Sequence, residues 1–131
     1  MKRLSLRCAL CNLQVSEVLN PLTDLAMLSE EDGHPLLPAG LYVMSSTFLD
    51  AGHTWDTITR DEIILNLNDV LNCQAGGVRN GCCGVDGLDG INTFCRSGHP
   101  LGTEKSDCWM PHFIHIPLAH VHLECDTEPA E

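Results

Sequence analysis

The chain has 131 residues and eight cysteines, and its 18 acidic and 7 basic side chains give a formal charge of −11. Its hydrophobic content of 44% suffices for one core and excludes a wholly disordered chain. The excess of acidic side chains opposes binding to nucleic-acid phosphates and to anionic lipids, so neither nucleic acid nor membrane is expected as a partner. We therefore expect one domain over residues 1–131.

The amino terminus has only part of the pattern of an export signal. Residues 1–8 begin with basic side chains, but Arg7 interrupts the apolar stretch that a signal peptide requires. No stretch reaches the roughly 18–20 apolar residues of a membrane-spanning helix. We therefore expect a soluble, cytoplasmic protein. In a reducing cytosol, clustered cysteines bind metal more often than they form permanent disulfides.

The first part of the chain contains signals for short elements. Alternation of apolar and polar residues predicts a strand over 4–8 that leads into a turn. Helix-like apolar spacing over 15–28, interrupted by Pro21, predicts a short helix or an irregular segment. Turn-forming residues fill 30–40, and a strand is expected over 41–44.

The second part is less regular. Residues 58–71 are ambiguous, because alternation around 63–67 favours a strand while Asn68 is suited to cap a helical turn. Glycine is too frequent between 73 and 102 for side-chain packing alone to hold regular structure. Over 113–125, Pro117 permits an edge strand or a break between two short strands. The fold class expected is α+β or mainly β.

Cysteine spacing provides the strongest chemical signal. Cys8-Ala9-Leu10-Cys11 has the two-residue spacing of a metal knuckle, in which a tight turn brings two thiolates to one ion. This segment resembles half of a zinc ribbon, and the resemblance covers about ten residues. Because a closed zinc site needs four ligands, this pair requires two more from elsewhere in the chain.

The further ligands are expected in the last third of the chain. Glycines flank the Cys82-Cys83 pair, and Cys108 and His112 form a Cys-x3-His pair with an acceptable ligand spacing. The candidate metal ligands are Cys8, Cys11, Cys82, Cys83, Cys95, Cys108 and His112. Our model has one structural zinc held by Cys8, Cys11 and two of the later cysteines. Its binding free energy would order the glycine-rich stretch and clasp it to the amino terminus.

Two alternatives for the cysteines remain open at this point. In one, the thiols form the disulfides of an exported domain; in the other, they are buried free thiols that pack as small hydrophobes. Adjacent residues on an extended backbone point to opposite sides, so Cys82 and Cys83 are not expected to bind the same ion. The spacing of an iron–sulfur site is absent.

A group of histidines near the carboxyl terminus suggests a different function. On a strand, His120, His122 and Glu124 would share one face, and such a His-x-His pair can bind a second or catalytic zinc. The alternative function is therefore a metal-dependent hydrolase that uses these residues with His112 or His115. A simpler interpretation is a solvated strand face. The His-x-Glu pair resembles zinc deaminases, but the Pro-Cys-x-x-Cys element of those enzymes is missing.

The sequence thus predicts one metal-stabilised domain with three notable segments. Residues 1–14 hold the strand and knuckle, 73–112 form a Gly/Cys-rich metal-binding region, and 124–131 form an acidic tail. We expect a non-enzymatic binding or regulatory module. Its acidic character is typical of an inhibitor or immunity-type protein that binds a basic protein partner.

Overall fold

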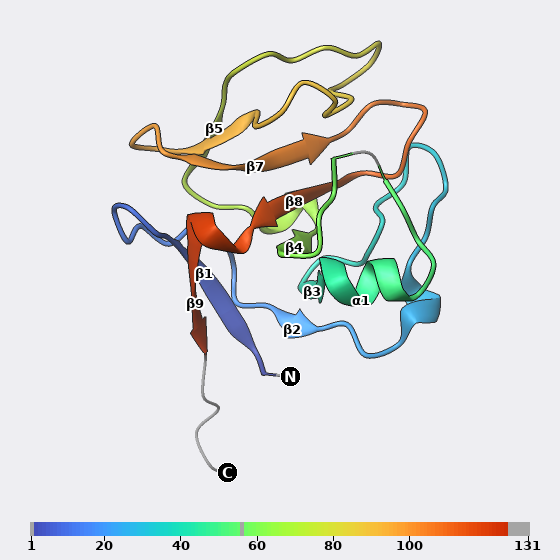
Figure 1. Cartoon of the computed structure of the whole chain (residues 1–131), viewed down its shortest axis with the longest axis horizontal. Helices are drawn as coiled ribbons and strands as arrows, with labels where there is room; N and C mark the ends of the chain where they lie inside the picture. Colours follow the sequence, from blue (N-terminus) through green and yellow to red (C-terminus); the bar gives the residue numbers. More distant parts are fainter. Residues whose placement is uncertain (1, 56, 126–131) are drawn as a thin grey trace.

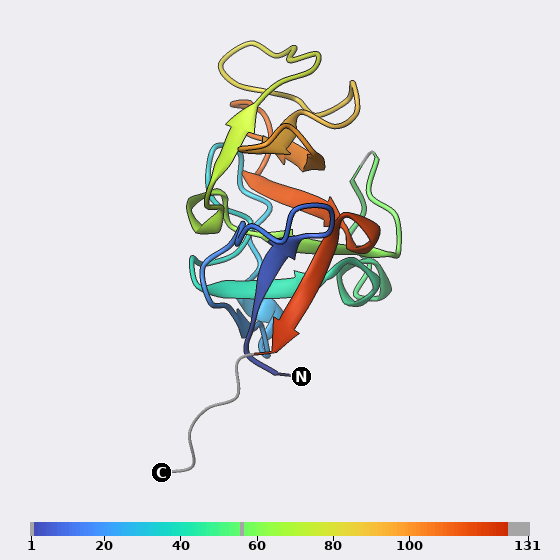
Figure 2. The ribbon, with the colours of Figure 1, turned by 90° about the vertical axis from the view of Figure 1, so that its left-hand side faces the viewer.

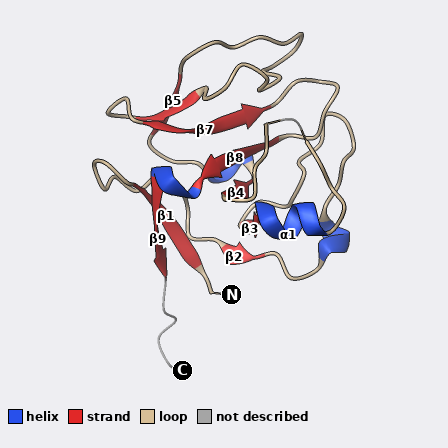
Figure 3. Cartoon of the chain, in the orientation of Figure 1, coloured by secondary structure: helices blue, strands red, loops and turns tan. Residues whose placement is uncertain are grey.

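The computed structural model describes residues 2–55 and 57–125, and strands make up most of its regular structure (Figures 1 and 3). One sheet has the strand order β2 (Asn20–Pro21), β3 (Leu41–Met44), β4 (Glu62–Leu65), β8 (Phe113–Pro117), β7 (Pro100–Lys105), β6 (Thr93–Cys95) and β5 (Cys73–Ala75). A second sheet pairs β1 (Leu4–Cys8) with β9 (Val121–Cys125). The mainly β alternative of the predicted fold class is therefore confirmed.

The two sheets differ in direction. Figure 2 shows β1 and β9 running steeply across β3 and β4 of the larger sheet. All pairs in the larger sheet are antiparallel except β2 with β3. The helical elements are short: α1 (Ser45–Asp50) and the 3-10 turns Leu25–Met27, Leu67–Asp69 and Leu118–His120.

Two apolar clusters form the core. The first joins the sheets and includes Leu4, Leu6 and Ile63, and the second surrounds Phe48 of α1 and includes Leu37. All five side chains are buried. Full burial of such a side chain stabilises the fold by about 1.5–3 kcal/mol. The apolar side chains buried between the two sheets therefore make a main contribution to holding the sheets together.

Several predicted elements are confirmed. Strands occupy 4–8 and 41–44, and the segment over 113–125 divides into two strands separated by the 3-10 turn at 118–120. The ambiguous region contains both a strand, β4, and a 3-10 turn. That turn is capped by Asn66, which accepts a hydrogen bond from the Asn68 backbone N–H, and not by Asn68 as predicted.

Residues 15–28 were predicted to form a short helix or an irregular segment, and most of them are irregular. The Val15 N–H donates to Leu6 O over 2.8 Å, and Leu4 and Leu19 exchange two backbone hydrogen bonds. Pairing with β1 satisfies these backbone groups and places Val15 and Leu19 in the core. The helix-like spacing of these two apolar residues therefore belongs to an extended segment and not to a helix.

The glycine-rich region contains more regular structure than predicted. It includes β5, β6 and the start of β7, while residues 76–92 form a long loop at the top of Figures 1 and 2. Most of the predicted acidic tail, residues 126–131, lies outside the described residues. No helix in the described part of the chain is both long and apolar enough to cross a bilayer.

Gly102 permits the close approach of β7 to β8. A Cβ atom at this position would lie 2.5 Å from His115 O and 2.8 Å from Ile116 Cγ1. We expect Gly102→Ala to lower the free energy of unfolding by about 2–3 kcal/mol, measured by urea denaturation. Gly52→Ala is the control, because no atom lies within 4 Å and only its φ of 95° opposes a side chain. A smaller loss for Gly102→Ala than for Gly52→Ala would contradict the prediction.

Candidate metal centres

Four potential ligands meet where the two sheets approach each other. Cys8 is the last residue of β1, and Cys11 lies in the turn that follows it. Cys95 is the last residue of β6, and His99 lies in the turn before β7. The ligand atoms of these four residues all lie within 4.8 Å of one another. In Figure 1 the two turns project from the same side of the molecule.

The distances in this group fit a tetrahedral metal site. Cys11 Sγ lies 3.8 Å from Cys95 Sγ, and His99 Nδ1 lies 3.6 Å from Cys8 Sγ and 3.3 Å from Cys95 Sγ. Around a tetrahedral zinc, neighbouring sulfurs are about 3.8 Å apart, and a sulfur and a nitrogen about 3.6 Å apart. The group therefore has the composition and spacing of a Cys3His site that can hold a metal ion.

Both turns have the hydrogen bonding of a metal knuckle. The backbone N–H groups of Leu10 and Cys11 bond to the Cys8 thiol, and those of Ser97 and His99 bond to the Cys95 thiol. Such bonds orient the sulfurs and stabilise their thiolate form. The Gly98 φ of 93° allows the second turn, and its N–H donates to Cys95 O over 2.8 Å.

Cys95 is the thiol of this group best suited to ionise. Burial alone would raise its pKa, but the backbone N–H groups of His99 and Ser97, with the Cys11 and His99 side chains, lower the pKa to about 6. Burial raises the pKa of Cys8 above its ordinary value. Because the thiolate is the metal-binding form, Cys95 is prepared for a cation and Cys8 would lose its proton on binding one.

A second group contains Cys82, Cys83 and Cys108. Their sulfurs also lie within 4.8 Å of one another, and all three residues are exposed. Two segments supply them, the 76–92 loop and the connection between β7 and β8.

The Asp107 carboxylate joins these two segments. It accepts hydrogen bonds from the backbone N–H groups of Cys83 at 2.9 Å, Cys108 at 2.8 Å and Cys82 at 3.1 Å, and from the Trp109 indole at 2.7 Å. These donors hold the pKa of Asp107 far below its usual range. The negatively charged carboxylate thus holds the backbone of all three cysteines in place.

In the second group, the negative charge of one thiolate disfavours ionisation of its neighbours. The hydrogen bond with Cys83, followed by burial and the negative charges nearby, raises the pKa of Cys108 to about 12. The pKa of Cys82 is raised too, mainly by its hydrogen bond with Cys83 and the charge of that thiol. A bound cation would reverse this effect, because it stabilises all three thiolates together.

The structure divides the predicted ligands differently from our one-zinc model. It brings Cys95 to the amino-terminal knuckle, while Cys82, Cys83 and Cys108 lie in a separate group. The expectation that Cys82 and Cys83 point to opposite sides is wrong, because this segment is bent and not extended.

One predicted ligand is outside the groups, and one grouped residue was not predicted. His112 belongs to neither group within the described residues, and its Nε2 lies 3.0 Å from Asp107 O. His99 belongs to the first group. Its Cys95-x3-His99 spacing equals that of Cys108 and His112, so the signal was present in the sequence.

The carboxyl-terminal histidines do not assemble into a metal site among the described residues. The expectation that His120 shares a strand face with His122 and Glu124 is wrong, because His120 belongs to the preceding 3-10 turn and its Nδ1 lies 2.8 Å from Leu101 O. Glu124 is exposed and accepts a hydrogen bond from Arg7 Nε over 3.1 Å.

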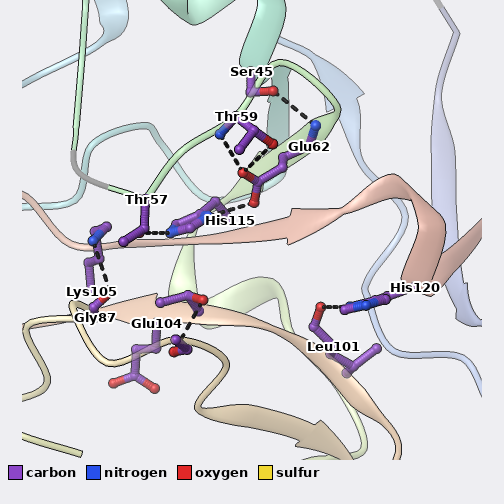
Figure 4. A network of polar contacts seen from close by, with 12 residues as sticks. Ser45, Thr57, Thr59, Glu62, Gly87, Leu101, Glu104, Lys105, His115 and His120 are labelled. Carbon is purple, nitrogen blue, oxygen red and sulfur yellow. Dashed lines mark hydrogen bonds and ion pairs between the residues drawn. The ribbon is translucent and has the colours of Figure 1, made fainter.

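His115 instead forms a buried pair with Glu62 (Figure 4). His115 Nδ1 lies 2.6 Å from Glu62 Oε1, and the other carboxylate oxygen accepts bonds from the Thr59 N–H and hydroxyl. Burial would raise the pKa of Glu62, but its bonds and its charge interaction with His115, aided by Thr59, lower it overall. Thr57 Oγ1 is 3.4 Å from His115 Nε2, longer than the usual contact of a nucleophile with its base. The pair is best explained as a structural link between β4 and β8.

A cavity of about 290 Å³ opens beside the larger sheet. Leu67, Cys73 and Ile114 contribute to its lining, and no residue of either cysteine group does so. The two candidate metal sites are therefore distinct from this cavity.

No protein-family model, curated protein or solved structure matches the chain at a significant level.

Proposed function

We propose that this chain is a zinc-binding, non-enzymatic module that recognises a protein partner. Cys8, Cys11, Cys95 and His99 would hold the zinc as a structural ion. The observation that carries the proposal is the tetrahedral spacing of these four ligand atoms, which come from turns next to strands of two different sheets. We name this group the clasp.

Zinc fits the clasp better than other common ions. Thiolate and imidazole ligands favour zinc over magnesium and calcium, which prefer oxygen. Four protein ligands complete a tetrahedral shell and leave no position for a substrate, as in structural zinc sites. Cys8 and Cys95 are also fully buried, which favours retention of the ion.

The charge of the chain supports a basic protein partner. The formal charge is −11, and three thiolates with one zinc would add further negative charge. An acidic surface attracts basic partners and accelerates their association. This supports an inhibitor or immunity-type role, in which the zinc maintains the fold and the surface makes the contact.

Zinc content tests the metal part of the proposal. Native mass spectrometry of the reduced full chain should show bound zinc, and Cys11→Ser should lose the ion of the clasp. Cys125→Ser is the matched control, because Cys125 is exposed and lies outside both groups; it should bind as much zinc as the wild type. Equal zinc content in wild type and Cys11→Ser would contradict the assignment.

Salt dependence tests the partner part. Proteins captured by the immobilised full chain should be basic, and their binding should weaken steeply as ionic strength rises. Partners that are acidic, or that remain bound at high salt, would contradict recognition by charge.

A further inference from the structure

The second cysteine group has properties that the clasp lacks. Three thiols converge at the surface, and a buried carboxylate holds the backbone at each of them. We propose that Cys82, Cys83 and Cys108 form a second zinc site, which binds the ion through three thiolates and leaves its fourth position open to an external nitrogen or sulfur ligand. This inference goes beyond the proposed function, and the clasp does not depend on it.

Asp107 prepares the site before any ion binds. The residue is 1% exposed, and its carboxylate accepts hydrogen bonds from backbone N–H groups on both segments that carry the thiols. In a simple knuckle such N–H groups point to sulfur, whereas here they are fixed by a carboxylate. Asp107 is thus a positioning residue, and its negative charge further favours a cation nearby.

The loop that carries Cys82 and Cys83 is closely packed against its neighbour. A Cβ atom at Gly81 would lie 1.8 Å from Gly84 O, and one at Gly84 would lie 2.2 Å from Ser106 O. Only glycine permits this approach, which places the two adjacent thiols beside Cys108.

Further bonds hold the same loop in place. The Val85 N–H donates to Ser106 Oγ over 3.1 Å, and the Ser106 N–H donates to Val85 O over 2.8 Å. These contacts fix the thiol-bearing loop to the segment after β7. The backbone contacts of this loop therefore bring the three thiols close together.

The fourth coordination position has no donor from the described part of the chain. Among those residues, no histidine, cysteine or carboxylate joins the three sulfurs within the 4.8 Å limit. The Asp107 oxygens already accept four donors, and His112 Nε2 faces Asp107 O. A zinc with three protein ligands keeps an exchangeable position, which water or a partner's histidine or cysteine can fill. The half-exposed Trp109 beside the site offers apolar surface to such a partner.

Cobalt titration of the reduced full chain tests this proposal, because tetrahedral Co²⁺ bound to thiolates has strong visible and charge-transfer absorption. The wild type should bind two equivalents, and Cys83→Ser should bind one while keeping the spectrum of the clasp. His99→Ala should weaken only the clasp, and Cys125→Ser should behave as the wild type. Competition with zinc should displace both cobalt ions.

Imidazole tests the open position. Its addition should change the cobalt spectrum of the wild type but not that of Cys83→Ser, in which the clasp keeps all four protein ligands. Asp107→Asn should weaken binding at the second site by about 10–100-fold and leave the clasp affinity unchanged, an asymmetry that general unfolding would not produce. Equal numbers of cobalt equivalents in the reduced wild type and in Cys83→Ser would overturn the proposal, and so would an absence of any imidazole effect or equal affinities for Asp107→Asn and wild type. If only the clasp failed to bind metal, the wild type would bind one cobalt ion and Cys83→Ser would bind none.

Discussion

Removal of the clasp metal is expected to unfold the chain. A structural zinc contributes on the order of 10 kcal/mol in small metal-dependent domains, which is as much as the whole stability of a typical domain. A strong chelator, or Cys95→Ser, should therefore abolish the cooperative thermal transition. The reason is local: without the ion, the turn after β1 and the turn between β6 and β7 would be joined mainly by thiol contacts.

Circular dichroism during heating, with and without chelator, measures this effect. Cys125→Ser should melt like the wild type, because Cys125 belongs to neither group. Restoring zinc to the chelated wild type should restore the transition, whereas Cys95→Ser should not recover. A transition that persists in Cys95→Ser would show that the core holds the sheets together without the clasp.

Loss of the Glu62–His115 pair is expected to have the next largest effect. Both side chains are at least 96% buried, and a buried partner left alone destabilises a protein by about 3–5 kcal/mol. Glu62→Gln should lower the free energy of unfolding by about 3 kcal/mol near neutral pH. The exposed carboxylate of Glu31 provides the control, and Glu31→Gln should change stability by less than about 0.5 kcal/mol.

The effect of Glu62→Gln should depend on pH. Because the folded-state pKa of Glu62 lies below its unfolded value, its carboxylate stabilises the fold above the ordinary glutamate pKa of about 4.3. That stabilisation disappears as pH falls through the lowered folded-state pKa. Urea denaturation at a series of pH values should therefore show wild type and variant converging in acid. A difference that grows toward low pH would contradict the assigned role.

Local patterns predicted most of the strands. Alternation at 4–8 and the position of Pro117 correctly indicated β1 and the division between β8 and β9. The helix-like spacing from Val15 to Leu19 was misleading, because those residues are buried by pairing with β1 and not by a helix. The spacing of apolar residues indicates which side chains are buried, but it does not show with which segment their backbone forms hydrogen bonds.

The sequence by itself determined the chemistry available to this protein: a Cys-x2-Cys knuckle near one end, further cysteines and histidines in the last third, and a strongly acidic composition. Only the tertiary structure decided how these ligands are grouped. Cys95 and His99 meet Cys8 because β1 and β6 end at the same place, whereas Asp107 and the close approach of Gly84 hold Cys82 and Cys83 near Cys108. Ligand spacing is local, but the choice of partners depends on contacts between residues 24 to 91 positions apart, which no local pattern records.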